Sequence, residues 1–192
     1  MLVTLATSNL HKIEEINLIA KKYNIEFVLP KEKFNPVENG STFIENATCK
    51  VIEASKSGKT ELYLADDSGL CVEALNGEPG IYSARYEETP DKRIEKLLKN
   101  MKGIKNRAAK FVCAMVVANK EGEVLFQTQG ECLGYIMDEK KGTNGFGYDP
   151  VFFVNKYQKG MAELAPEEKA LVSHRSVALN KVLNWLKNEY KN

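Results

Sequence analysis

The sequence predicts an α/β fold: elongated, two-lobed, and built around a long mixed β-sheet with flanking helices. Short apolar runs typical of strands are mixed with segments in which apolar residues recur at helical spacing. Two long β-type runs, 107–119 and 123–136, meet at Glu121-Gly122 and predict a hairpin in mid-chain. No linker, repeat or low-complexity segment divides the chain, so we expect one domain over 1–192 with a cleft between its two lobes.

The N-terminal half should begin as strand, helix and strand, followed by a capped helix. Residues 2–6 form a short apolar run, after which isoleucine and leucine recur at helical spacing to about residue 23. A second strand is expected at 25–29. Thr42 should cap the next helix, with Glu45 in its capping-box position.

The later elements follow from similar patterns. A strand of apolar residues at 62–65 is expected to end at Asp66, where polar residues begin. Residues 70–88 contain several glycines and prolines and should be mostly loop. A Thr-Pro pair at 89–90 predicts the start of a helix, and another short strand is expected at 151–154.

The composition is that of an ordinary globular protein. The chain has 27 basic and 26 acidic residues, so its net charge of +1 provides no general field for nucleic-acid or membrane binding. We find no secretion signal and no apolar run of the roughly 20 residues that a membrane helix needs, and we expect a cytoplasmic protein. The cysteines lack zinc-ribbon or redox spacing and are expected to be reduced, packed thiols: Cys49, Cys71, Cys113 and Cys132.

The first candidate binding segment is the turn between the first strand and the first helix. Thr7, Ser8 and Asn9 are small polar residues at the predicted helix N-terminus, and Lys12 lies in its first turn. Backbone N–H groups and the helix dipole favour an anion there. The segment lacks the glycines of a Walker loop. Taken alone, it also fits a helix cap beside a solvated lysine.

The second candidate is the pair of carboxylates in Ala-Asp-Asp-Ser-Gly. Asp66 and Asp67 follow a buried strand, and paired negative charge in such a place needs a counter-ion. Magnesium is a natural one, because it prefers oxygen ligands and keeps waters for substrate phosphates. Glu38, Glu45 and Lys50 could complete the site if they converge on Asp67. The alternative is an ordinary Asp-Ser-Gly turn.

Two later segments could bind a flat ligand. In Thr-Asn-Gly-Phe-Gly-Tyr-Asp-Pro, glycines flank Phe146 and Tyr148, which either stack on a base or pack into the core. Further along, Lys169 precedes the segment Ser173-His174-Arg175, in which Ser173 should cap the last helix. Cations in the first turn of a helix oppose its dipole, so an anion or a base acceptor should compensate for them.

Together these segments resemble one known family, the inosine triphosphate pyrophosphatases or XTP/dITP diphosphatases. The resemblance covers the chain almost from end to end, and the matching blocks occur in the family's order. The ENAxxK and DDSG blocks of this sequence are similar to those of the bacterial branch. Ser8 departs from the family, which often has glycine there. The matching blocks are TSNLHK, VENGSTFIENATCK, LADDSGLCVEALNGEPGIYSARY, GFGYDPVFF, AELAPEEK and SHR.

The resemblance implies an elongated α/β homodimer that binds a nucleotide between its lobes. It implies Mg²⁺-dependent hydrolysis of ITP, dITP and XTP to the monophosphate and pyrophosphate, with Mn²⁺ as a possible substitute. Such an activity removes deaminated purines from the nucleotide pool. From the near-neutral charge and the lack of an apolar run long enough for a membrane helix, we expect neither a nucleic acid nor a membrane as partner.

The resemblance also implies roles for individual residues. Asp67 would be general base and metal ligand, and Lys50 would stabilise charge that develops on the phosphates. Glu38 would be the other metal ligand, with Asp66 and Glu45 in support. Residues expected to contact the triphosphate or lie beside it are Thr7, Ser8, Asn9, Lys12 and Ser68. Residues expected to surround the base are Phe146, Gly147, Tyr148, Asp149, Lys169, His174 and Arg175.

Three other interpretations stay open on the sequence. A related pyrophosphatase could act on modified pyrimidine or methylated nucleotides. A nucleotide sensor without catalysis should have a defective set of carboxylates, whereas here the set is complete. A nucleic-acid-binding module is disfavoured by the near-neutral charge.

Overall fold

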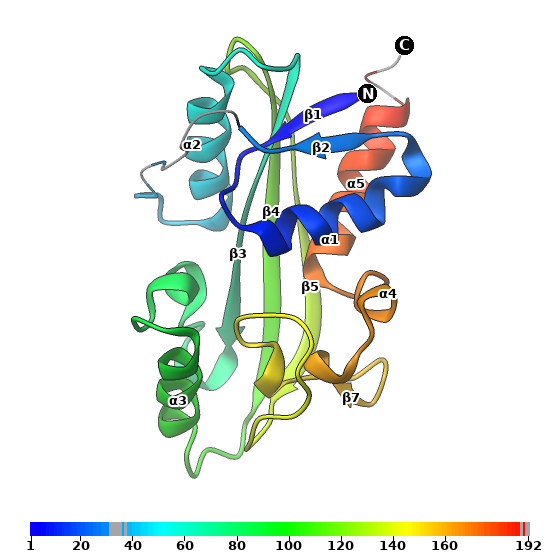
Figure 1. Ribbon diagram of the computed structural model, residues 1–192. Helices are drawn as coiled ribbons and strands as arrows, with labels where there is room; N and C mark the ends of the chain where they lie inside the picture. Colours follow the sequence, from blue (N-terminus) through cyan, green and yellow to red (C-terminus); the bar gives the residue numbers. More distant parts are fainter. Residues whose placement is uncertain (31–35, 37, 189, 191–192) are drawn as a thin grey trace. The chain divides into compact units, whose positions relative to one another are not determined.

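The computed structural model describes residues 1–30, 36, 38–188 and 190 (Figure 1). Five short 3₁₀ turns accompany the regular elements in these described residues. The strands and helices are β1 (Leu2–Leu5), α1 (Leu10–Ala20), β2 (Glu26–Val28), α2 (Phe43–Ser55), β3 (Leu62–Val72), α3 (Pro90–Asn100), β4 (Ala108–Asn119), β5 (Val124–Ile136), β6 (Phe152–Val154), β7 (Lys159–Gly160), α4 (Pro166–Lys169) and α5 (His174–Asn188).

The strands form one mixed seven-stranded sheet in the order β2-β1-β3-β4-β5-β6-β7. β1 pairs in parallel with both β2 and β3, whereas β6 pairs antiparallel with β5 and with β7. β4 and β5 are neighbours joined by a tight turn, at which the Asn119 N–H bonds to the Glu123 carbonyl at 3.0 Å. The predicted α/β fold, mixed sheet and central hairpin are confirmed.

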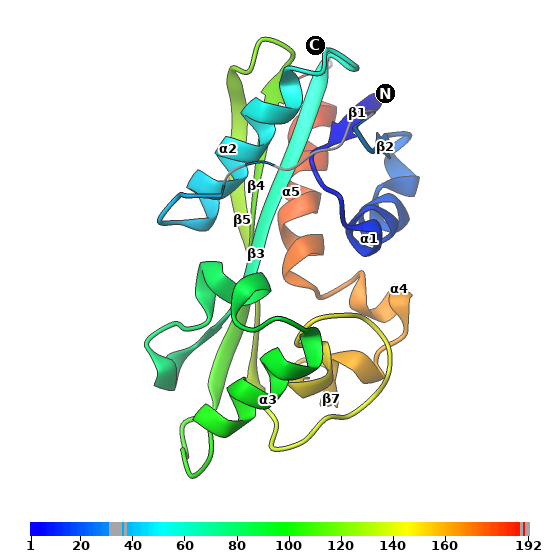
Figure 2. The ribbon, with the colours of Figure 1, turned by 60° about the vertical axis from the view of Figure 1, so that its left-hand side comes forward.

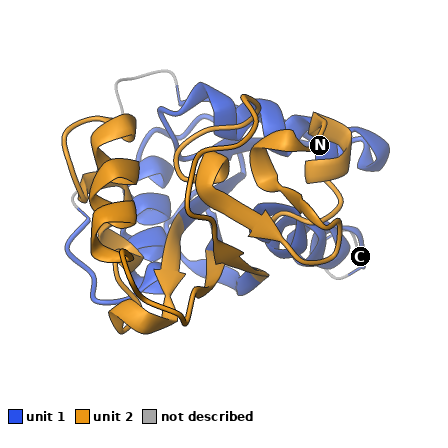
Figure 3. Ribbon diagram, turned by 90° about the horizontal axis from the view of Figure 1, so that it is seen from below, with its two compact units in different colours: residues 1–67, 113–130, 174–192 blue, residues 68–112, 131–173 orange. Residues whose placement is uncertain are grey.

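The chain divides into two compact units, coloured separately in Figure 3. Unit 1 contains residues 1–67, 113–130 and 174–192, and unit 2 contains residues 68–112 and 131–173. The expected cleft between the two lobes stays a prediction. Part of the segment before α2, residues 31–35 and 37, lies outside the described residues.

In unit 1 the strands run between α2 on one side and α1 with α5 on the other (Figure 2). α2 buries Ala47, Val51 and Ala54 against small and aromatic side chains of the strands. α5 lies very close to β5, because a Cβ at Gly130 would come within 2.4 Å of the backbone of α5. The helices that carry the candidate site residues are thus seated closely on the strands.

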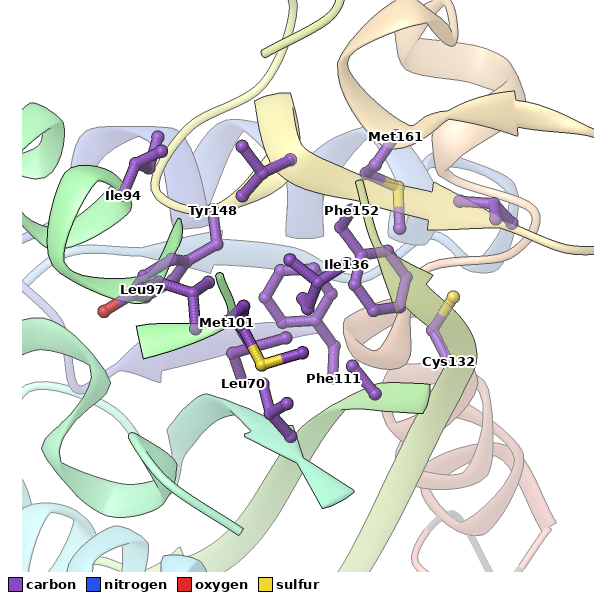
Figure 4. Close-up of a cluster of buried hydrophobic side chains, with 14 of the residues drawn as sticks. Leu70, Ile94, Leu97, Met101, Phe111, Cys132, Ile136, Tyr148, Phe152 and Met161 are labelled. Carbon is purple, nitrogen blue, oxygen red and sulfur yellow. The ribbon is translucent and has the colours of Figure 1, made fainter. Parts of the chain in front are cut away.

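Unit 2 has its own apolar core, shown in Figure 4. Leucine and isoleucine side chains of α3, and Met101 directly after it, lie in this core with Phe111 and Phe152, whose ring centroids lie 4.5 Å apart. Tyr148 is part of this core and is 5% exposed.

No helix among the described residues is long and apolar enough to cross a membrane.

Most predicted elements are found, but the end of the strand that begins at Leu62 was predicted wrongly. β3 continues through the acidic pair to Val72 instead of ending before Asp66. The polar residues resemble a turn, but Lys12, Arg175 and Lys50 bind the two carboxylates and allow the strand to remain buried. The expected loop at 70–88 likewise contains the end of β3 and two 3₁₀ segments.

Candidate functional site

Asp66 is a carboxylate of β3 whose side chain has no solvent exposure. Lys12 Nζ donates to its Oδ1 at 2.9 Å, and the guanidinium of Arg175 lies 3.4 Å from its Oδ2. The thiol of Cys113 also faces Oδ2, at 4.0 Å. Burial alone raises the pKa of Asp66, but Lys12 and then Arg175 outweigh it and hold that pKa well below its ordinary value. The carboxylate is therefore ionised and fixes two cations in unit 1.

Arg175 lies in the first turn of α5 and is 1% exposed. Its Nη1 donates to Glu15 Oε2 at 2.8 Å, so Glu15 and Asp66 both compensate for the guanidinium charge. An anion or a base acceptor was expected to compensate for a cation in this turn, and for Arg175 the structure shows protein carboxylates in that role. Its place beside the base stays a prediction. The sequence reading missed Glu15, although it lies three residues after Lys12, a spacing that places both on one face of α1.

A second cluster of charges centres on Lys50, which α2 holds in a buried position at 6% exposure. Its Nζ lies 2.7 Å from Glu38 Oε1 and 2.8 Å from Asp67 Oδ1, and it donates to the Asp66 carbonyl at 3.0 Å. The convergence of Glu38, Lys50 and Asp67, which sequence spacing cannot show, is present in the structure. All three residues belong to unit 1.

The protonation of this cluster follows from burial and charge. Burial raises the pKa of Asp67 above its ordinary value, against the opposing effect of Lys50. Burial also lowers the pKa of Lys50, but Asp67 and Asp66 outweigh that effect and raise it overall. Lys50 is consequently charged at neutral pH, and the pKa of Asp67 lies above that of an aspartate in water. A base of this kind can accept a proton from an attacking water.

The turn before α1 forms as expected from its small polar residues. Asn9 caps the helix, with its side chain accepting from the His11 N–H at 3.0 Å. Thr7 Oγ1 in turn accepts from the Asn9 N–H at 3.1 Å, and Ser8 is exposed. Lys12 uses one of its N–H groups on Asp66 and is still partly exposed, so it can bind a second anion.

Two supporting metal ligands proposed from the sequence have other partners. Glu45 is exposed and accepts hydrogen bonds from the hydroxyl and backbone of Ser41, which lower its pKa, and its own N–H donates to Thr42 Oγ1 at the cap of α2. Asp66 is enclosed by Lys12 and Arg175. We therefore assign Glu45 to helix capping and Asp66 to the positioning of cations.

The candidate base-binding residues of unit 2 form a separate group. Asp149 Oδ2 accepts from the Phe146 N–H and from Lys169 Nζ, both at 2.8 Å. Lys169 is 8% exposed, and its Nζ lies 4.7 Å from the centre of the half-buried Phe146 ring. A Cβ at Gly145 would lie 2.1 Å from Asp149 Oδ2, which explains why the loop needs glycine there.

The remaining candidate residues lie in different surroundings. Tyr148 packs in the core and donates to the Ser83 carbonyl at 3.0 Å (Figure 4). Its buried ring therefore offers no stacking surface for a base. Gly147 has φ of 62°, a left-handed conformation that favours glycine. Ser68 is partly exposed and belongs to unit 2, whereas His174 is buried in unit 1.

The carboxylate oxygens near Lys50 are suitable ligands for a hard divalent cation. A carboxylate oxygen of Glu38 and one of Asp67 both contact the Lys50 nitrogen, so these oxygens lie close enough together to bind one cation. Within the described ranges no group of three or more His, Cys, Asp or Glu side chains could hold a metal ion. Two carboxylates are nevertheless the set that Mg²⁺ uses where substrate phosphates and waters complete its shell.

An α/β fold that holds lysines of α1 and α2 against a buried pair of carboxylates on β3 defines a class of proteins suited to bind a phosphate-bearing ligand. Comparison with known proteins defines the class further. The model of the Ham1 family matches residues 3–185, and the chain belongs to this family.

Relatives and solved structures agree with this assignment. The chain is 40% identical over 179 residues to the dITP/XTP pyrophosphatase of Synechocystis, covering 93% of this chain and 92% of that protein. It is 42% identical over 196 residues to the dITP/XTP pyrophosphatase of Treponema denticola, covering 97% and 99%. The structure of the Staphylococcus aureus Ham1 protein superposes with a TM-score of 0.86 at 40% identity, covering 98% of this chain and all of that one.

Proposed function

We propose that this chain hydrolyses non-standard purine nucleoside triphosphates, namely ITP, dITP and XTP, to the monophosphate and pyrophosphate. The observation that carries the proposal is the convergence of Glu38 and Asp67 on Lys50 in unit 1. It occurs in a chain about 40% identical, over nearly its full length, to proteins named dITP/XTP pyrophosphatases. The enzyme would be a cytoplasmic hydrolase that keeps deaminated purines out of nucleic acids.

Glu38 and Asp67 would hold the catalytic Mg²⁺ ion, for which Mn²⁺ could substitute. When bound, the ion would supply Lewis-acid stabilisation of charge on the phosphate oxygens. Asp67 would orient and deprotonate the attacking water, a role that suits its raised pKa. Its contact with Lys50 at 2.8 Å keeps one carboxylate oxygen in a fixed position during this step.

Lys12 and Lys50 would bind the phosphate chain from two different elements. Asp66 holds the Lys12 ammonium at 2.9 Å and leaves its other N–H groups for phosphate oxygens. Lys50 is a buried cation, and its charge acts more strongly on a developing phosphate charge than it would in water. Preorganised cations of this kind need no rearrangement during the reaction.

Phe146 and Lys169 would bind the purine in unit 2. The half-buried Phe146 ring offers a stacking face, and Lys169 supplies a donor for the 6-keto oxygen of hypoxanthine or xanthine. Adenine has an amino group at this position and would leave the donor unpaired. Mismatches of this kind can discriminate by about 10⁴-fold.

Product analysis with separate nucleotides tests the proposal. We expect dITP and XTP to give the monophosphate and pyrophosphate with Mg²⁺, and dATP and dTTP to stay nearly intact. Removal of divalent cations with EDTA should abolish the reaction, and added Mg²⁺ or Mn²⁺ should restore it. Release of inorganic phosphate in place of pyrophosphate, or a preference for a pyrimidine, would contradict the proposed bond or the proposed base.

A homodimer is the proposed assembly, and unit 2 offers a surface that supports it. Leu133 on β5 is 64% exposed, and Tyr135, two residues on and also exposed, points to the same side of the strand. Tyr135 stacks on Phe153 of the neighbouring β6 with ring centroids 4.5 Å apart. An exposed apolar strip of this kind on a sheet is typical of protein–protein contacts.

Replacing Leu133 with lysine should therefore convert the dimer to a monomer, because a charge would be buried in an apolar interface. Light scattering after size-exclusion chromatography measures the change in mass. Leu171→Lys is the matched control, since Leu171 is 70% exposed in the same unit but lies outside this strip. A wild-type chain that is already monomeric, or a dimer that survives Leu133→Lys, would rule out this surface.

A further inference from the structure

Asn46 is a fully buried amide on α2 that the proposed mechanism does not use. Its Nδ2 donates to Asp67 Oδ2 at 3.2 Å, and its Oδ1 accepts from the Gly40 N–H at 2.9 Å. The backbone N–H of Gly40 can only donate, so the oxygen of the amide must face Gly40 and the nitrogen must face the carboxylate. Both polar ends of Asn46 thus have a defined partner.

The first contact fixes the orientation of Asp67. Asn46 and Lys50 are four residues apart on α2, so they lie on the same face of the helix. Lys50 donates to Asp67 Oδ1 and Asn46 donates to Oδ2, so each carboxylate oxygen has its own donor. Two donors on separate oxygens restrain the rotation of a carboxylate, whereas one donor alone leaves it free to turn.

The second contact fixes the chain that carries Glu38. Gly40 lies two residues after Glu38 and packs so closely on α2 that an added Cβ would lie 2.6 Å from Glu45 Cβ and 2.9 Å from Asn46 Oδ1. The hydrogen bond from Gly40 to Asn46 holds this close approach. One buried side chain therefore positions both the segment of Glu38 and the carboxylate of Asp67.

We propose that Asn46 is a positioning residue that sets the spacing of Glu38 and Asp67 for one divalent cation. This inference rests on the proposed function, because it assigns a metal to the same two carboxylates. Residues that orient metal ligands typically change metal affinity or activity by about 10- to 100-fold when they are replaced. Asn46 does not contact the substrate in this proposal and acts only through Asp67 and Gly40.

The test compares Asn46→Ala with wild type in two measurements. The first is the dissociation constant for Mn²⁺ as the sole added ligand, from electron paramagnetic resonance, which does not depend on turnover. The second is the Mg²⁺ concentration that gives half-maximal dITP hydrolysis. We expect both to rise by about tenfold or more. Excess Mg²⁺ should restore much of the kcat of Asn46→Ala but not that of Asp67→Asn.

Two further variants separate positioning from general loss of stability. Val51→Ala removes buried volume from the same helix and should lower the melting temperature. It should leave both metal constants, the Mn²⁺ dissociation constant and the Mg²⁺ concentration for half-maximal hydrolysis, at wild-type values. Gly40→Ala leaves the Asn46 side chain in place but forces the Glu38 segment away from α2. It should raise both metal constants even if Asn46→Ala does not fold.

The outcomes distinguish this inference from the proposed function. A wild-type chain that does not hydrolyse dITP would refute the function itself. An active wild type with unchanged metal constants in Asn46→Ala and Gly40→Ala would refute only the positioning role. Failure of the active wild type to bind Mn²⁺ would also refute that role, because it requires carboxylates that are already spaced for a cation.

Discussion

Replacing Asp67 with asparagine should lower the kcat for dITP by at least about a hundredfold, and by up to about 10⁴-fold. The amide keeps the size of the carboxylate but removes the charge that would bind the metal and accept the proton of water. Nucleotide affinity should stay within a few-fold of wild type, because Lys12 and the base-binding residues of unit 2 are unchanged. Steady-state kinetics and calorimetric binding of dITP measure the two quantities separately.

A surface carboxylate supplies the control for this variant. Asp91 also pairs with a lysine, Lys140, but its side chain is 79% exposed. Asp91→Asn removes the same charge and should leave both kcat and affinity unchanged. If Asp67→Asn weakened dITP binding in proportion to its loss of kcat/KM while kcat stayed normal, Asp67 would be a binding residue and not the base.

Replacing Asp66 with asparagine should lower the free energy of unfolding by about 3–5 kcal/mol, the usual cost of removing one partner from a buried ion pair. Asp66 holds both Lys12 and Arg175, and the buried guanidinium would then lose one of the carboxylates that face it. Urea unfolding followed by circular dichroism measures the change. Glu88→Gln is the control, since its exposed pair with Lys92 contributes less than about 1 kcal/mol.

The acid dependence of stability gives an independent check on Asp66. Its pKa in the folded state lies below the ordinary value of 3.8, so its ionisation stabilises the fold above that value. This contribution is lost as the pH falls through the lower, folded-state pKa. The difference in stability between wild type and Asp66→Asn should therefore shrink below pH 3.8. A difference that stayed constant there would mean that packing, not charge, causes the loss.

Much of the fold follows from local patterns in the sequence. Thr42 and Thr89 cap α2 and α3 as their spacing predicts, because a hydroxyl at that position satisfies a free N–H group of the first helical turn. The two long β-type runs form the neighbouring strands β4 and β5. The strand that continues through Asp66 was missed, because local composition does not show that distant cations neutralise it.

For the candidate site too, the sequence indicates residue types but not the contacts between distant elements. Lys12, Lys50 and Asp67 could be selected individually from their residue types and their places in the predicted elements. Their actual contacts could not be: Lys12 and its partner Asp66 are 54 positions apart, and Lys50 and Asp67 are 17 apart on different elements. Tyr148 was assigned to the wall of the base site, whereas it lies in the core of unit 2.

The sequence by itself therefore determined the α/β class, the helix caps, the central hairpin and the residue types available for phosphate and metal chemistry. These features depend on neighbours within a few residues or on periodic patterns. Only the tertiary structure decided that Lys50 joins Glu38 to Asp67, that Asp66 binds two cations and that Asn46 spans Asp67 and Gly40. Each of these contacts depends on how α1, α2 and α5 pack on the strands of unit 1, and side-chain distances between separate elements are set by that packing.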